Sequence, residues 1–91
     1  MPVKVRIPTP LRQLTNGVDL VDAQAGSVGD VLGQLTAQFA GMDKRLFKTP
    51  GELNRFVNIY VNDEDIRFLQ NLATPIKDGD ELSIVPAIAG G

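Results

Sequence analysis

The sequence predicts an α+β fold in which a mixed sheet of four to five strands packs on one main helix. Residues 3–7 and 56–62 alternate apolar with polar side chains, which is the period of a half-buried strand. Between them, residues 28–40 carry apolar side chains at helical spacing. A sheet and a helix that are each apolar on one side bury these surfaces against each other, so two packed layers are expected. A chain of 91 residues fits one such domain.

The first two strands are expected to form a hairpin. Residues 3–7 make the first strand, which ends near Pro8 and Pro10 because proline cannot donate a ladder hydrogen bond. An Asn-Gly pair at 16–17 is a turn signal. Residues 18–23 can then return as the second strand, after a connection longer than a tight turn.

The helix is predicted over residues 28–40. Ser27 precedes it, and its hydroxyl can accept a hydrogen bond from an early helical N–H, which stabilises a helix by about 1 kcal/mol. Asp30 lies three residues further on and makes a variant of the capping box. Gly41 is the expected stop. The apolar face that should enter the core comprises Val28, Val31, Leu32, Leu35 and Phe39.

The second half of the chain supplies the remaining strands. Residues 42–54 are polar and irregular and are predicted to form a loop. Residues 56–62 have the strongest strand pattern, and residues 66–68 are expected to pair back briefly after an acidic turn. The last strand is predicted at 81–86, after an Asp-Gly-Asp turn. This order of elements is that of the β-grasp, or ubiquitin-like, fold.

Two surface features of this half have competing interpretations. Three carboxylates in the turn, those of Asp63, Glu64 and Asp65, are interpreted as a solvated surface rather than a metal or general-acid site, because no histidine or second cluster accompanies them. Phe68 and Leu69 follow in a polar neighbourhood. They belong either to the core or to an apolar docking patch.

Composition excludes several classes of activity. The chain has no cysteine and no histidine, which excludes disulfides, thiolate metal sites, a cysteine nucleophile and the commonest general base. The net charge is −2 and the basic residues are scattered, so nucleic-acid binding is not expected. Apolar runs are too short to span a bilayer, so a cytoplasmic protein without a membrane partner is expected. We expect no metal and no cofactor bound by this chain.

The end of the sequence is the strongest functional candidate. Residues 87–91 follow the last strand, are all small or apolar, and close on Gly90 and Gly91. We therefore expect a folded domain over 1–86 and a flexible tail over 87–91, with an extended reach of about 17 Å. Glycine has no Cβ, so such a tail can thread a narrow channel and deliver its terminal carboxylate to another protein's active site.

Each tail position has an expected role. Gly91 would carry the reacting carboxylate, and Gly90 with Ala89 would give access to a narrow site. Apolar contact with a partner is expected around the exit of the tail at Pro86, Ala87 and Ile88, and at Phe68.

A carboxylate is a poor acyl donor because it is anionic. Converting it with ATP into a mixed anhydride with AMP supplies a good leaving group. A sulfur nucleophile can then replace AMP and leave a thiocarboxylate on Gly91, which can deliver sulfide without releasing it. This chemistry needs no cysteine, histidine or metal in the chain itself.

Three motifs together resemble the MoaD/ThiS family of ubiquitin-like sulfur carriers. They are Val61-Asn62 with the acidic turn, the Asp-Gly-Asp-Glu-Leu run at 78–82, and the closing Pro-Ala-Ile-Ala-Gly-Gly at 86–91. The resemblance covers essentially the whole chain. Within the family, residues 55–68 most resemble the CysO-type carriers of actinobacterial cysteine biosynthesis.

The resemblance implies a protein co-substrate rather than an enzyme. It implies an E1-like adenylating enzyme of the MoeB/ThiF type, which uses ATP to activate Gly91. The CysO-type likeness implies a cysteine synthase that accepts the sulfide on an activated serine bound to its pyridoxal phosphate. It also implies a JAB-type metalloprotease that releases cysteine from the tail.

Other functions use the same tail. The chain can be the small subunit of a molybdopterin synthase, with its tail inserted into the large subunit, or a carrier for thiamin thiazole synthesis. It can also be a protein modifier that forms an isopeptide bond from Gly91 to a lysine. A plain interaction module with an incidental tail is the remaining alternative.

Overall fold

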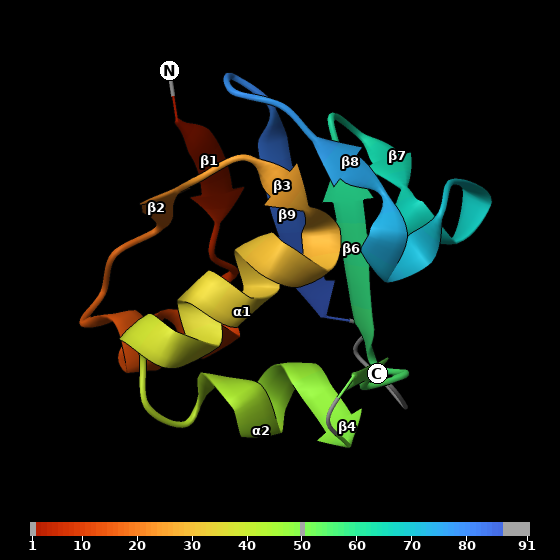
Figure 1. The fold of residues 1–91 in the computed structure, drawn as a ribbon. Coiled ribbons are helices and arrows are strands. Elements are labelled where there is room, and N and C mark those ends of the chain that lie inside the picture. The colour runs from red at the N-terminus through yellow and green to blue at the C-terminus, as the bar shows by residue number, and fades with distance from the viewer. Residues whose placement is uncertain (1, 50, 87–91) are drawn as a thin grey trace.

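The predicted two-layer α+β architecture is confirmed. The structure, a computed structural model, describes residues 2–49 and 51–86. A mixed five-stranded sheet has the strand order β2-β1-β9-β6-β7, and two helices lie across one of its faces (Figure 1). The strands of this sheet are β1 (Val3–Arg6), β2 (Leu20–Ala23), β6 (Val57–Val61), β7 (Glu64–Asp65) and β9 (Glu81–Pro86).

The helix layer consists of α1 (Val28–Gln38) and α2 (Met42–Leu46). The capping box predicted at the start of α1 is present: the Asp30 N–H donates to the Ser27 hydroxyl at 3.1 Å, and the Ser27 N–H donates to the Asp30 carboxylate at 3.0 Å. The helix ends at Gln38, two residues before the predicted end.

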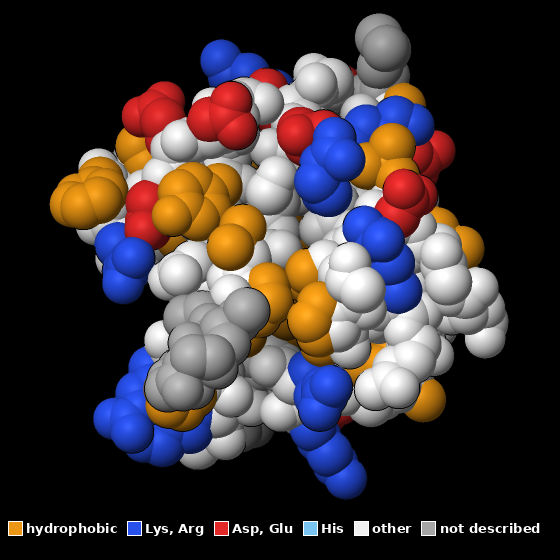
Figure 2. Space-filling model, turned by 180° about the vertical axis from the view of Figure 1, so that it is seen from behind, with side chains coloured by type: hydrophobic (Ala, Val, Ile, Leu, Met, Phe, Trp, Pro, Cys, Tyr) orange, Lys and Arg blue, Asp and Glu red, His pale blue; other side chains and the backbone are white. Residues whose placement is uncertain are grey.

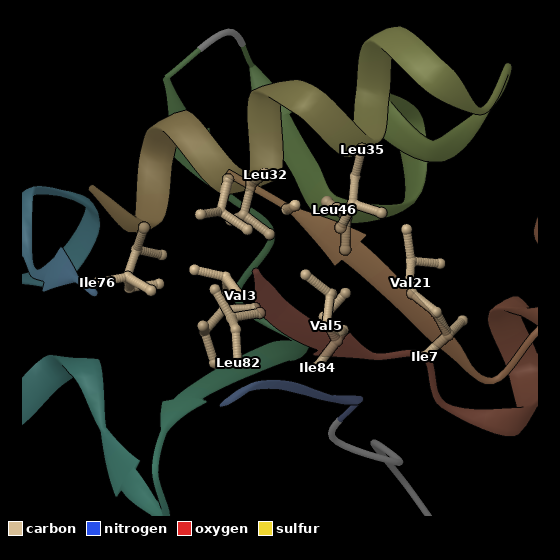
Figure 3. Packing of buried hydrophobic residues seen from close by; sticks show 14 of the residues in the cluster. Val3, Val5, Ile7, Val21, Leu32, Leu35, Leu46, Ile76, Leu82 and Ile84 are labelled. Atoms are coloured by element: carbon tan, nitrogen blue, oxygen red, sulfur yellow. The ribbon is translucent and has the colours of Figure 1, made fainter. Parts of the chain in front are cut away.

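The core lies between α1 and the sheet. Figure 3 shows Leu32 and Leu35 of α1 above Val5 of β1 and Leu82 and Ile84 of β9. All five side chains are at most 3% exposed. The predicted apolar face of the helix is therefore in the core, except that Phe39 is only partly buried against it.

The prediction of an irregular loop over residues 42–54 is wrong. This segment contains α2 and a small hairpin of β4 (Phe47–Thr49) and β5 (Glu52–Leu53). Gly41, with a φ of +87°, does not simply end α1 but turns the chain directly into α2. Met42 and Leu46 are fully buried, one helical turn apart, under the end of α1. Five residues are too short a window for a helical period to stand out from a polar background.

Three further details differ from the prediction. The connection after β1 is a 3₁₀ helix, η1 (Thr9–Thr15), so the second strand begins at Leu20 rather than at residue 18. After β7 the chain forms the 3₁₀ turn η2 (Ile66–Phe68), and the strand that pairs back onto β6 is β7 instead. The remaining short elements are β3 (Gly26–Ser27), η3 (Asn71–Ala73) and β8 (Pro75–Ile76), of which β3 pairs with β8.

Within the described residues, no helix is both long enough and apolar enough to cross a membrane.

Replacing Leu46 with alanine tests the contribution of α2. Because Leu46 is fully buried, we expect the free energy of unfolding, measured by urea denaturation, to fall by about 2–5 kcal/mol. The exposed neighbour Lys44 serves as the control: Lys44→Ala should change the free energy by less than about 0.5 kcal/mol. Equal small losses for both variants would contradict the burial of α2.

Candidate functional site at the end of strand β9

Strand β9 carries the chain to the predicted tail through the middle of the sheet. It pairs in parallel with β1 and antiparallel with β6, in registers that include Val5↔Leu82 and Val57↔Pro86. Its inward side chains, Leu82 and Ile84, are buried. β9 is therefore held by two neighbouring strands and the core, and Pro86 at its end is placed by its pairing with β6.

The two neighbours of β9 end at different levels. The β6 register continues to Pro86, whereas the β1 register stops at Arg6↔Ser83. The Lys4 N–H donates to the Asp80 carbonyl at 3.0 Å, and donors in such a parallel row recur at every second residue. After residues 4 and 6, the next donor on β1's side would be residue 8. This residue is Pro8, which has no N–H, so the hydrogen bonding to β9 ends there. Among the residues that the structure describes, residues 84–86 thus have register partners on β6 only, and no described strand pairs with their other side.

A shallow hollow of about 570 Å³ lies along this open side. Its walls come from the chain just after β1, from β6 and from the last residues of β9. The lining residues are Arg6, Ile7, Pro8, Thr9, Arg12, Tyr60, Asp63, Ser83, Ile84, Val85 and Pro86. Val85 points away from the core and is 41% exposed, so the hollow offers an apolar surface beside the exit of the tail.

Charged side chains form cross-strand pairs at one end of this apolar surface and further along the same face of the sheet. On the face of the sheet away from the helices, Arg6 pairs with Glu81 at 3.0 Å, and Lys4 pairs with Asp22 at 2.6 Å. Figure 2 looks onto this face and shows hydrophobic side chains between patches of both charges. Arg12 donates its Nε–H to the Ile7 carbonyl at 3.1 Å. The arrangement suits contact with another protein, with an apolar centre and a charged rim.

Asn62 and Asp80 fix the turn that precedes β9. The Asn62 amide donates to the Asp80 carboxylate at 3.0 Å and accepts from the Glu81 N–H at 3.0 Å. The other oxygen of Asp80 accepts from the Lys77 N–H at 2.9 Å. The start of β9 is thereby tied to the turn after β6, so that the strand has a defined position at both ends.

These hydrogen bonds lower the pKa of the Asp80 carboxyl below its ordinary value. The largest cause is the Lys77 N–H, followed by the Asn62 amide. Both favour the charged form, so the turn is most stable when Asp80 is ionised.

The acidic turn does not behave as one solvated cluster, so that prediction is wrong for one of its members. Asp63 and Glu64 are exposed, but the Asp65 side chain is only 7% exposed and is paired with Arg67 at 2.7 Å. Hydrogen bonds from the Arg67 side chain and N–H lower the pKa of Asp65. No group of three or more acidic side chains within the described residues is placed to hold a metal ion.

Of the predicted contact residues, the structure places two. Pro86 ends β9, and Phe68 lies in η2 with 86% of its surface exposed, which excludes the alternative that it belongs to the core. The two lie on different parts of the molecule. Ala87, Ile88, Ala89, Gly90 and Gly91 lie outside the described residues, and their roles stay predictions.

Sequence reasoning missed the open side of β9. Its signal was present in the proline at position 8. It could not be interpreted before the parallel pairing of β1 with β9 was known.

Comparison with known proteins identifies the family. A model of the ThiS family matches residues 5–91. The chain belongs to the ThiS family. Among the curated members, the sulfur carrier protein CysO of Mycobacterium tuberculosis is 52% identical over 93 residues, which cover the whole of both chains.

Solved structures share the fold of this ThiS family member. The M. tuberculosis CysO crystal structure matches with a TM-score of 0.87 and 50% identity, over 94% of this chain and 99% of that one. A chain in the crystal structure of the Amycolatopsis orientalis BexX/CysO complex matches with a TM-score of 0.89 and 44% identity, over 98% and 99% of the two chains. The small archaeal modifier protein 1 of Methanosarcina acetivorans matches with a TM-score of 0.86 and 33% identity, over 98% and 95%.

Replacing Asp80 with asparagine tests the turn before β9. At pH 7 we expect Asp80→Asn to lower the free energy of unfolding by about 1 kcal/mol, because one oxygen acceptor is lost. The pKa of Asp80 is lower in the folded state, so its contribution is complete above the unfolded pKa of about 3.9 and disappears as the pH falls through the folded value. The difference between the wild type and Asp80→Asn should therefore shrink in urea denaturation as the pH falls below the unfolded pKa of about 3.9 and through the lower folded value.

The exposed neighbour Asp78 provides the control. Asp78→Asn should leave the stability at pH 7 nearly unchanged. A difference between Asp80→Asn and the wild type that is the same at neutral and acidic pH would contradict the role of the ionised carboxyl.

Proposed function

We propose that this ThiS family member is a sulfur carrier protein, a co-substrate that other enzymes act on through Gly91. The observation that carries the proposal is the position of β9: the strand is held at the centre of the sheet and ends at Pro86, five residues before Gly91. A sequence of small residues is thus attached to a firmly placed strand beside an open apolar hollow. The full-length similarity to a protein named sulfur carrier protein CysO supports the same function.

The chemistry would proceed in two steps at Gly91. An E1-like adenylating enzyme binds ATP, and a carboxylate oxygen of Gly91 attacks the α-phosphorus, which releases pyrophosphate and forms the acyl adenylate. Sulfide then attacks the acyl carbon, the bond to the AMP oxygen breaks, and AMP leaves. The product is a thiocarboxylate that carries one sulfur in place of one oxygen.

Cysteine biosynthesis is the proposed destination of the sulfur, because the sequence motifs resemble those of CysO-type carriers. The thiocarboxylate sulfur would attack the β-carbon of a serine whose hydroxyl has been activated as a leaving group, in a synthase that supplies pyridoxal phosphate. A JAB-type metalloprotease would then hydrolyse the bond between the tail and the new cysteine, which restores the carboxylate of Gly91. The folded domain contributes by presenting the tail and by docking to each enzyme.

A second candidate function is supported by a separate observation. The chain is 33% identical to an archaeal protein named as a small modifier, with closely similar structure. A modifier would join Gly91 to a lysine amine of a target after the same activation. The two functions differ in their products, since a carrier accumulates a thiocarboxylate and a modifier forms adducts of higher mass.

Intact-mass analysis tests the carrier function. After incubation with ATP, sulfide and a candidate adenylating enzyme, the mass should rise by the difference between sulfur and oxygen, and fragmentation should place the change on Gly91. A chain without Gly90 and Gly91 should remain folded and unmodified. Failure of the full chain to gain sulfur with several adenylating enzymes would overturn the proposal.

A substitution at the hollow tests whether this surface docks the activating enzyme. Val85→Asp places a charge on the apolar lining, and we expect the KM for the carrier in the thiocarboxylation assay to rise at least about tenfold, since a charge buried at an interface costs several kcal/mol. Val18 is similarly exposed, at 44% against 41% for Val85. Val18→Asp should leave KM within about twofold, and an equal effect of both substitutions would show that the hollow has no special role.

A further inference from the structure

Phe68 is the most exposed of the large hydrophobic side chains in the described part of the chain. It is 86% exposed, whereas the others with substantial exposure lie between 38% and 44%. Burying an aromatic side chain is worth about 2 kcal/mol or more, and this ring gains little of that. Leu69, the next residue, is 38% exposed and lines a neighbouring hollow that shares Glu64 with the hollow at Phe68.

The backbone beneath Phe68 is firmly held on its N-terminal side. Ile66, the first residue of η2, is only 2% exposed and anchors the turn in the core. The Asp65 carboxylate accepts a hydrogen bond from the Arg67 N–H at 2.9 Å and from the Arg67 guanidinium at 2.7 Å. The Leu69 N–H closes the turn on the Ile66 carbonyl at 2.9 Å.

The chain after Phe68 is fixed as well. The Gln70 N–H donates to the Thr74 hydroxyl at 2.9 Å, and Thr74 is 5% exposed. The Thr74 carbonyl accepts from the N–H of Val28, the first residue of α1, at 2.9 Å. Both ends of the segment around Phe68 are thus bonded to the folded body. A ring displayed on a well-supported turn loses little conformational freedom when a partner binds it.

The surface around Phe68 is negatively charged. Phe68 lines a hollow of about 490 Å³ whose other lining residues are Tyr60, Asp63, Glu64, Asp65 and Arg67. The charge of Asp65 is balanced by Arg67, but the ion pairs found among residues 2–49 and 51–86 include neither Asp63 nor Glu64. An aromatic ring beside two free carboxylates is complementary to an apolar pocket with a basic border.

Phe68 itself lies away from the exit of the tail, although Tyr60 and Asp63 border both hollows. The β6 register places Val61 opposite Leu82 and Val57 opposite Pro86. The turn after β6 is therefore about 13 Å along the strand from the exit, at ~3.3 Å per residue. In Figure 1, the segment that follows β7 projects on the side of β6 away from β9. A partner can contact this surface while the tail occupies a site elsewhere on the same partner.

We propose that Phe68, with Leu69 beside it and Asp63 and Glu64 at its border, is a second docking anchor for an enzyme that acts on the tail. That enzyme presents an apolar pocket bordered by lysine or arginine side chains. The proposal rests on the carrier function. Binding through the anchor holds the tail at a high effective concentration near the active site, so the anchor contributes affinity and partner choice and takes no part in the chemistry at Gly91.

Titration calorimetry with two purified enzymes, a candidate adenylating enzyme and a candidate cysteine synthase, tests the anchor. Phe68→Ala should weaken binding of the full-length chain to at least one of them by roughly tenfold or more, as truncation of a central aromatic contact does. Leu20 lies on the opposite edge strand and is 39% exposed. Leu20→Ala, as the control, should change the affinity by less than about twofold. Unchanged affinity of Phe68→Ala for both enzymes would overturn the proposal.

The salt dependence of binding tests the role of Asp63 and Glu64 at the border of the anchor. The double variant Asp63→Asn, Glu64→Gln should bind the affected enzyme more weakly at low salt, and the difference from the wild type should decrease as salt is raised. A difference that does not depend on salt would overturn the assignment of a basic border to the partner.

Two further measurements separate the possible outcomes. If sedimentation shows that the wild type self-associates and Phe68→Ala does not, the anchor serves a second copy of this chain and the proposed partner is wrong. Intact-mass analysis of Phe68→Ala at saturating adenylating enzyme should still show the thiocarboxylate, because the tail is unchanged. If the wild type takes up no sulfur, the carrier function is wrong. If the wild type takes up sulfur and only Phe68→Ala binds the enzyme more weakly, the carrier function stands and the anchor is supported.

Discussion

The burial of β9 at the centre of the sheet is the interaction on which the rest of the structure depends. Leu82 and Ile84 lie under α1, and the strand is paired with β1 on one side and β6 on the other. A parallel neighbour and an antiparallel neighbour meet at this one strand, so it joins the first and last parts of the chain. The end of the folded domain at Pro86 is therefore continuous with a strand that the core and two neighbouring strands hold in place.

The same strand shows how a stable fold can leave a surface available. β1 stops pairing before β9 ends, because the chain reaches Pro8 and turns into η1. β9 continues with support from β6 alone, and Val85 and Pro86 lie along an open hollow. The gap along the last residues of β9 is thus a consequence of one proline at the end of β1.

The two surfaces of the domain adjoin at Tyr60 and Asp63, which line both hollows, but they differ in chemistry. The hollow beside β9 presents the apolar residues Ile84, Val85 and Pro86, and its Arg6 is neutralised by Glu81. The surface around Phe68 is acidic, because Asp63 and Glu64 have no basic neighbour among the described ion pairs. A carrier that meets several enzymes through one tail needs some surface away from the tail to distinguish them, and a charged aromatic anchor is suited to that role.

The sequence by itself determined the α+β class, the capped helix, the alternating strands and the likeness to sulfur carriers, because each depends on local periodicity or a short motif. It did not reveal α2, since two buried residues one turn apart carry no visible period. It left Phe68 undecided and placed Asp65 in solvent, because exposure depends on which distant segments cover a residue. Those answers, and the open side of β9, required the tertiary structure: they follow from strand pairing between residues that lie far apart in the chain.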